Sequence, residues 1–175
     1  MGVNYKTVES WISILETTYI VFRLQPYYEN YGKRTIKSSK IYFYDTGLLC
    51  YLLGFDGEKE MMSHYALENL FENMIVADVK KQLLNHRSSS QLYFWSDSEH
   101  NEVDLLIKNG DQLYPVEIKA GRTFNSDYIK GIKVWNSARG REELGHVIYT
   151  GENLETRSVR LLNWKSVSDL TKYLV

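Results

Sequence analysis

Two periods of apolar and polar positions run along the chain and predict its helices and strands. Apolar residues at helical spacing occur over 7–15, 46–53, 65–84, 127–138 and 167–174. Alternating, β-branched or aromatic runs typical of strands cover 19–24, 40–44, 91–95, 102–108, 112–119, 145–149 and 158–162. An antiparallel hairpin followed by a crossover helix and another strand predicts an α/β fold, with a mixed sheet flanked by helices.

The pattern changes near residue 60, which predicts two domains. Residues 1–60 read as helix, short strands and helix, and their start resembles the turn and second helix of a helix-turn-helix. We therefore expect a partial winged-helix-like segment at 1–60, from a chain shortened at its N-terminus. The rest, 61–175, is expected to form the main domain.

The strands 102–108 and 112–119 carry the candidate chemistry. Asn109-Gly110 between them is a strong signal for a two-residue hairpin turn. A turn there pairs Lys108 with Asp111, Asp104 with Pro115 and Glu102 with Glu117.

The strand period then predicts which side chains share a face. Core positions are expected at Val103, Leu105, Ile107, Val116 and Ile118. The opposite face is expected to hold Glu102, Asp104, Glu117 and Lys119. Carboxylates held within about 5–8 Å repel each other unless a cation or protons intervene. A divalent metal is the expected cation, and Lys119 is placed to stabilise charge on an anionic substrate.

An acidic residue of the helix 65–84 could complete this group. Glu68 and Glu72 are four residues apart and therefore lie on one helix face. Solvated surface acids are the ordinary alternative, and they explain Glu68 better than Glu72.

Three motifs in this order resemble the PD-(D/E)XK nuclease superfamily: Phe71-Glu72-Asn73, Glu102-Val103-Asp104 and Val116-Glu117-Ile118-Lys119. More narrowly, the chain resembles uncharacterised domains found C-terminal to AAA+ ATPase modules in bacterial and archaeal proteins. That resemblance is carried by 32–34, 39–48, 70–73 and 92–95. It implies a restriction endonuclease-like fold for 61–175 and an N-terminal AAA+ ATPase module in the same full-length protein.

The nuclease resemblance also implies roles for individual residues. Glu72, Asp104, Glu117 and Lys119 would be catalytic, in metal-dependent hydrolysis of DNA phosphodiesters. Magnesium or manganese would be held by Asp104, Glu117 and the carbonyl of Ile118, with Glu72 as a direct or water-mediated ligand. Many superfamily members place glutamine or tyrosine in the following helix, and 127–138 offers Tyr128 but no glutamine.

A basic, aromatic stretch suggests a second binding surface. Lys33, Arg34, Lys37 and Lys40 follow several tyrosines, so this segment could be a wing that contacts DNA next to a recognition helix at 7–16. A solvated loop that docks on a partner domain explains it equally well.

Composition narrows the remaining possibilities. The chain has 175 residues, 43% of them hydrophobic, and a net charge of −1, so no overall basic field predicts strong non-specific nucleic-acid binding. The single cysteine and the lack of a signal peptide or long apolar run predict a cytoplasmic protein without membrane contact. No G-x-x-x-x-G-K-[ST] motif is present, so ATP would act only through an upstream domain. A non-catalytic DNA- or protein-binding regulatory module with a relict site is the alternative function, and the oligomeric state is left open.

Overall fold

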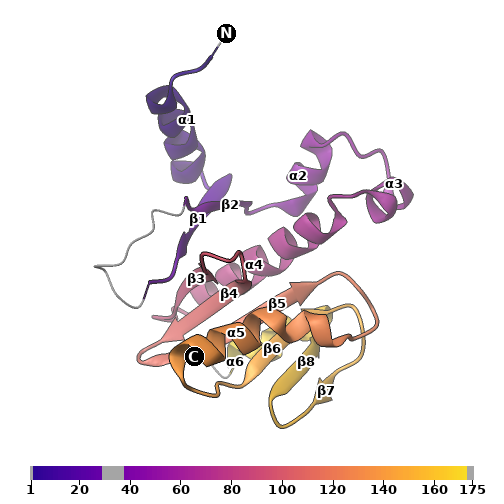
Figure 1. Ribbon diagram of the computed structural model, residues 1–175. Coiled ribbons are helices and arrows are strands. Elements are labelled where there is room, and N and C mark those ends of the chain that lie inside the picture. The colour runs from indigo at the N-terminus through magenta and orange to yellow at the C-terminus, as the bar shows by residue number, and fades with distance from the viewer. Residues whose placement is uncertain (1, 29–37, 173–175) are drawn as a thin grey trace.

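The computed structural model describes residues 2–28 and 38–172, and a single eight-stranded sheet runs through this part of the chain (Figure 1). The strand order is β2-β1-β3-β4-β5-β6-β8-β7, with both parallel and antiparallel neighbours. The strands are β1 (Val21–Pro26), β2 (Lys40–Phe43), β3 (Gln91–Ser96), β4 (Glu102–Asn109), β5 (Gln112–Lys119), β6 (Gly145–Tyr149), β7 (Leu154–Glu155) and β8 (Val159–Asn163). This confirms the predicted α/β class with a mixed sheet flanked by helices.

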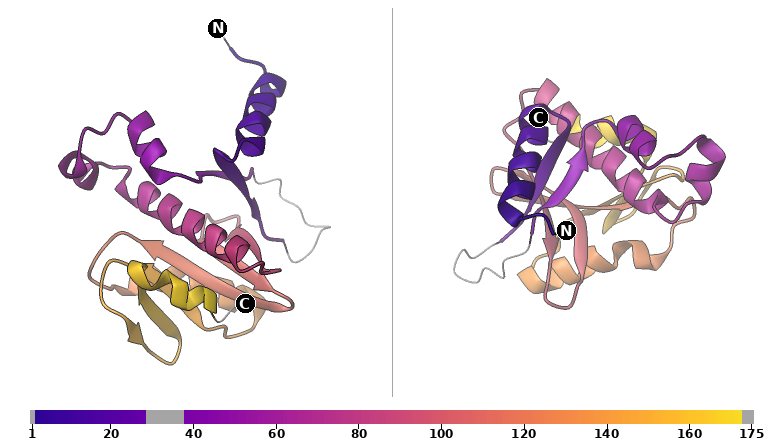
Figure 2. Two further views of the ribbon diagram at one scale, coloured as in Figure 1. Left: turned by 180° about the vertical axis from the view of Figure 1, so that it is seen from behind. Right: turned by 90° about the horizontal axis from the view of Figure 1, so that it is seen from above.

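Helices cover both faces of the sheet (Figure 2). They are α1 (Tyr5–Thr17), α2 (Thr46–Leu52), α3 (Glu58–Ser63), α4 (Leu67–Asn85), α5 (Lys130–Arg139) and α6 (Val167–Lys172), with short 3₁₀ turns at Ser126–Ile129 and Trp164–Ser166. Each predicted helix and strand is present, with ends that differ by a few residues. The short elements α3 and β7 were not predicted, because they are too brief to show a period.

Each face of the sheet has its own apolar core. On one side Ile75 and Val79 of α4 pack with Leu105 and Val116, and α6 joins them through Leu170. On the other side Trp135 of α5 packs with Val103, Leu106 and Leu113. Leu83 in the last turn of α4 is buried in the first of these cores, whereas its neighbour Leu84 is exposed.

The β4–β5 hairpin forms, but its register differs from the prediction by two residues. Leu106 lies opposite Pro115, and Asn109 lies opposite Gln112. The two turn residues are therefore Gly110 and Asp111, and Gly110 has the positive φ, 58°. A shift of two residues keeps every side chain on its face, so the predicted faces of β5 survive the error.

A bulge in β4 does change the faces. Tyr93 of β3 lies opposite Leu106, whereas Trp95 lies opposite Val103, so β4 has one more residue than β3 between these pairs. Val103 consequently packs on the α5 side with Leu106, not with Leu105 and Ile107 as predicted. A bulge re-aims the side chains on either side of it, and no sequence signal marked this one.

The N-terminal helix lies at the edge of the molecule. No residue of α1 is buried, and Arg23 of β1 holds the helix through ion pairs with Glu9 (2.9 Å) and Glu16 (3.3 Å). The helix and the antiparallel β1–β2 pair have the order that a recognition helix and wing require, but β1 also pairs with β3 and so belongs to the main sheet. In the described part of the chain, every helix is too short or too polar to cross a bilayer.

Candidate functional site at the β4–β5 fork

Asp104, Glu117 and Lys119, the fork cluster, meet where β4 and β5 separate. Their regular pairing ends at Leu105 and Val116, and beyond it the Asp104 carboxylate replaces the missing strand partner. Its Oδ2 accepts hydrogen bonds from the backbone N–H of Ile118 (2.8 Å) and from Lys119 Nζ (2.9 Å). Lys119 Nζ also lies 2.8 Å from Glu117 Oε2. One ammonium thus bridges the two carboxyl groups that the sequence predicted to lie together.

Burial controls the charge of the fork cluster. The side chain of Glu117 is 5% exposed, and burial, followed by the charge of Asp104, raises its pKa to about 9. At neutral pH Glu117 therefore keeps a proton. Burial alone would lower the pKa of Lys119, but Asp104 and Glu117 outweigh it, and the pKa is raised overall. In the fork cluster the proton on Glu117 therefore relieves the repulsion between the two carboxyl groups, as a bound cation would otherwise do.

Helix α5 approaches this cluster at a glycine. A Cβ on Gly131 would lie 1.9 Å from the carbonyl oxygen of Glu102 and 2.3 Å from Glu117 Oε1. Any larger side chain would displace one or the other. Gly131 therefore permits the close contact between α5 and the fork.

Lys40, Tyr42, Glu72 and Glu102, the rim cluster, form a second and more open group. Lys40 Nζ lies 3.0 Å from Glu72 Oε1 and also pairs with Glu102 Oε1. Tyr42 donates its hydroxyl to Glu72 Oε1. Burial, then Glu72, and to a lesser extent Asp104, raise the pKa of Tyr42, so the rim and fork clusters lie within electrostatic reach of each other.

The rim cluster depends on a clamp between α4 and β2. The buried Asn73 accepts a hydrogen bond from the N–H of Phe43 (2.7 Å) and donates to its carbonyl oxygen (3.1 Å). It also donates to Thr46 Oγ1, 3.0 Å away. Since Asn73 follows Glu72 directly, this clamp fixes Glu72 against the strand that carries Lys40 and Tyr42.

The other helix acid, Glu68, also reaches the sheet. Its Oε2 accepts a hydrogen bond of 2.9 Å from the N–H of Ala120, the residue after Lys119. The sequence favoured Glu72 over Glu68 as the helix acid of the site. In the structure, however, the Glu68 carboxylate is bonded to the end of β5, whereas the Glu72 carboxylate is bonded within the rim cluster.

The predicted residues are therefore brought together only in part. Asp104, Glu117 and Lys119 are in mutual contact, with the backbone of Ile118 beside them. Glu72 is held by Lys40 and Tyr42 instead, and the bulge carries Glu102 to the same rim. Among the described residues no group of three or more His, Cys, Asp or Glu side chains is arranged to hold a metal ion.

Of the four residues predicted to form a basic surface, the structure describes only Lys40. Lys33, Arg34 and Lys37 lie outside the described residues. Lys40 belongs to the rim cluster, where its ammonium already pairs with two carboxylates. DNA binding by this segment stays a prediction.

A groove opens beside the rim cluster. It has a volume of about 510 Å³, and its walls include Lys40, Tyr42 and Glu72 together with the exposed ring of Tyr65. Lys40, Tyr42 and Glu72 of the rim cluster can thus be reached from outside through a partly apolar opening.

Sequence reasoning missed two residues of this region, Tyr42 and Asn73. Tyr42 is two residues from Lys40 on a predicted strand, so their shared face was available as a signal. Asn73 appeared only within the nuclease-like motif, although a buried asparagine in an apolar helix face indicates a hydrogen-bonding role.

The fold and these clusters together define an α/β domain with charged side chains gathered at an opening in its central sheet. The chain belongs to a family described as a domain of unknown function (DUF4143), whose model matches residues 67–167. A second domain of unknown function (DUF8612) matches residues 1–59. The first match contains Glu72 and the fork cluster, and the second contains Lys40 and Tyr42.

Longer relatives carry the same region. Uncharacterized proteins of Mycobacterium tuberculosis and Mycobacterium bovis are each 31% identical to this chain over 123 residues. The alignment covers 70% of this chain and 27% of each relative. The chain therefore spans about a quarter of the length of the curated relatives it matches.

Proposed function

We propose that this chain is the C-terminal, nuclease-like domain of an AAA+ ATPase and hydrolyses DNA phosphodiesters with magnesium or manganese. The observation that carries the proposal is the convergence of Asp104, Glu117 and Lys119 where β4 and β5 separate. Domains of the DUF4143 family are often found at the C-terminus of AAA-ATPase-associated proteins, which supports the link to an ATPase.

The donor set of the fork fits a hard divalent cation. Two carboxyl groups and the backbone of Ile118 offer oxygen atoms, the ligands that magnesium and manganese prefer. Burial and the charge of Asp104 raise the pKa of Glu117, and this unfavourable meeting of two acids supports a role for a further cation there. Asp104, Glu117 and the Ile118 carbonyl would hold the ion, and Glu72 would act through water because its carboxylate is engaged at the rim.

Each residue of the fork then has a separate task. A bound ion would supply Lewis-acid stabilisation and an acidified water. Lys119 presents a cation whose raised pKa keeps it charged at neutral pH, and it can stabilise the negative charge that develops on a phosphate. Asp104 orients Lys119, and the N–H of Ile118 fixes Asp104.

A second function, a non-catalytic regulatory module with a relict site, has its own supporting observation. Both lysines of the two clusters are bonded to carboxylates, and the described residues include no three-acid metal group. In this alternative the ion pairs only hold the sheet and α4 together, and the exposed α1 serves to bind DNA or protein.

Manganese titration by calorimetry separates the two functions. If Glu117 gives up its proton when the ion binds, the heat must depend on the buffer's ionisation enthalpy and report release of about one proton at pH 7. The variants Asp104→Asn and Lys119→Met keep side-chain size. We expect Asp104→Asn to abolish binding, and both variants to reduce plasmid nicking by at least about 10²-fold.

The matched control is Glu142→Gln, at an exposed residue on the loop after α5. It should leave manganese binding and plasmid nicking unchanged. Nicking that persists in both fork variants would eliminate the nuclease proposal. Absence of manganese binding, with DNA binding that weakens as salt rises, would favour the regulatory module.

A further inference from the structure

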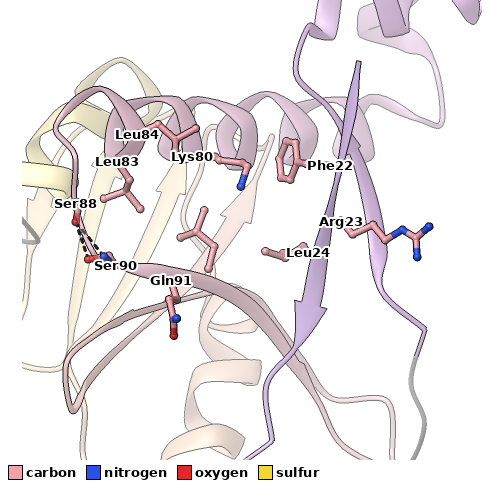
Figure 3. A pocket seen from close by; sticks show the side chains of 10 residues that line it. Phe22, Arg23, Leu24, Lys80, Leu83, Leu84, Ser88, Ser90 and Gln91 are labelled. Carbon is pink, nitrogen blue, oxygen red and sulfur yellow. Dashed lines mark hydrogen bonds between the residues drawn. The ribbon is translucent and has the colours of Figure 1, made fainter. Parts of the chain in front are cut away.

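A separate pocket lies between β1, the last turns of α4 and β3. Its volume is about 280 Å³, near the lower limit of pockets that bind small molecules (Figure 3). Most of its wall is apolar, and the remaining lining residues include two cations and no acid. The lining residues are Phe22, Arg23, Leu24, Lys80, Leu83, Leu84, Ser88, Ser90, Gln91 and Leu92.

The two cations differ in what they contact. Arg23 points out of the pocket, and Glu9 and Glu16 of α1 neutralise it. Lys80 extends from α4 into the space above Leu24, and no carboxylate pairs with it in the described part of the chain (Figure 3). The wall of this pocket therefore carries one uncompensated positive charge.

The surroundings of Lys80 make this charge costly. Its Nζ lies 4.9 Å from the centre of the Phe22 ring, a cation–π contact that stabilises an ammonium only modestly. Burial lowers the pKa of Lys80, as expected for a charge that has lost water without gaining a carboxylate. An anion entering the pocket would remove this cost, and the leucine side chains around it would bury an apolar group attached to that anion.

We propose that this pocket binds a small organic oxyanion, a carboxylate or a phosphate monoester on an apolar body, through Lys80. The charge of Lys80 supplies the selectivity for an anion, and the enclosure by Leu24, Leu83 and Leu92 supplies the selectivity for an apolar body. Lys80 follows Glu72 by eight residues on α4, about 12 Å along the helix, so the pocket is distinct from the rim cluster, and none of its lining residues belongs to the fork cluster. The proposal does not depend on the proposed nuclease function.

Four probes test the two selectivities by nuclear magnetic resonance titration of the backbone amides around Ser90 and Leu92. Benzoate and phenyl phosphate carry both an anion and a ring, benzamide lacks the charge, and inorganic phosphate lacks the apolar body. We expect at least one of the first two to bind at least tenfold more tightly than benzamide and inorganic phosphate. A preference between benzoate and phenyl phosphate tells whether the natural anion is a carboxylate or a phosphate.

Matched lysine substitutions on α4 complete the test. Lys80→Met should weaken binding of the preferred anion at least tenfold and leave benzamide binding unchanged, whereas Lys81→Met, at the neighbouring exposed lysine, should change neither. Lys80→Met should fold at least as stably as the wild type, because it removes a half-buried charge, and thermal unfolding checks this. Equal binding of benzamide, an unaffected Lys80→Met, or no binding of any probe at millimolar concentration would overturn the proposal.

Discussion

The fork and rim clusters are built alike but differ in burial. In each, one lysine bridges two carboxyl groups, and the side chains of Lys119 and Lys40 are both 27% exposed. The carboxyl groups differ: Asp104 and Glu117 are 11% and 5% exposed, whereas Glu72 and Glu102 are 18% and 36% exposed. The two clusters therefore have the same types of charged group, but the carboxyl groups of the fork are less exposed to solvent than those of the rim.

This difference decides what each cluster can do. In the fork, loss of water raises the pKa of Glu117 to about 9, so a proton is stored next to Asp104. In the rim, Lys40 pairs with both carboxylates, the Tyr42 hydroxyl donates a hydrogen bond to Glu72, and the Glu102 side chain is open to solvent. Under the proposed function the fork would exchange this proton for a metal ion, whereas the more exposed ion pairs of the rim contribute mainly a modest structural link.

Among the tests of this difference in burial, the pH dependence of the free energy of unfolding has the largest expected effect. Unfolding returns Glu117 from a pKa of about 9 to its ordinary value of 4.5, so between these values the unfolded chain releases a proton. The stabilising contribution is full below pH 4.5 and is lost as the pH rises toward 9, by up to about 1.4 kcal/mol per pH unit. Glu117→Gln removes this loss.

The free energy of unfolding of Glu117→Gln, relative to wild type, should therefore rise by roughly 3 kcal/mol between pH 6 and pH 8. Urea unfolding in the presence of EDTA measures it, and Glu142→Gln corrects for the general effect of removing one carboxylate. Parallel curves for wild type and Glu117→Gln would show that the fork does not store the proton.

Removal of each bridging lysine compares the clusters directly. Lys119→Met leaves the buried Asp104 without its cation and should lower the free energy of unfolding at pH 7 by about 2 kcal/mol. Lys40→Met leaves more exposed carboxylates and should cost less than about 1 kcal/mol. Equal losses in urea unfolding of the two variants would contradict the distinction by burial.

The contact of α5 with the fork should have a smaller effect on stability than the removal of Lys119. The Cβ of Gly131→Ala would meet Glu117 and the backbone of Glu102, so we expect a loss of about 1–2 kcal/mol and weaker manganese binding. Gly140→Ala, at the end of the same helix, is the control. Gly140 has a φ of 59° with open space around it, so alanine there should cost about 1 kcal/mol without changing manganese affinity. Unchanged manganese affinity in Gly131→Ala would remove α5 from the account of the site.

The sequence was sufficient for the elements because their periods are local. The alternation over 112–119 predicted β5 with its bounds, and the helical pattern over 46–53 predicted α2. Asp45 caps this helix, and its Oδ1 accepts a hydrogen bond from the Leu48 N–H. Gly54 follows that helix with a positive φ of 80°, a conformation that favours glycine. The hairpin was predicted too, but turn chemistry alone left its register two residues off.

The candidate site was predictable only for residues whose place follows from the alternation of side chains between the two faces of a strand. Asp104, Glu117 and Lys119 meet as expected, since parity survives a shift of two residues. The position of Glu102 was not predictable, because the bulge arises from pairing with β3, a strand that local reasoning about the hairpin does not include. The partners of Glu72 were missed for a similar reason: Lys40 and Tyr42 lie more than 25 residues away along the chain.

By itself the sequence determined the helices, the strands and the pairing of acids with a lysine on β4 and β5, because these depend on spacing within a few residues. The tertiary structure alone decided that Glu117 is buried enough to keep a proton, that Glu72 sits at the rim, and that Lys80 points uncompensated into a pocket. Burial and charge balance are sums over neighbours that only the folded chain brings together.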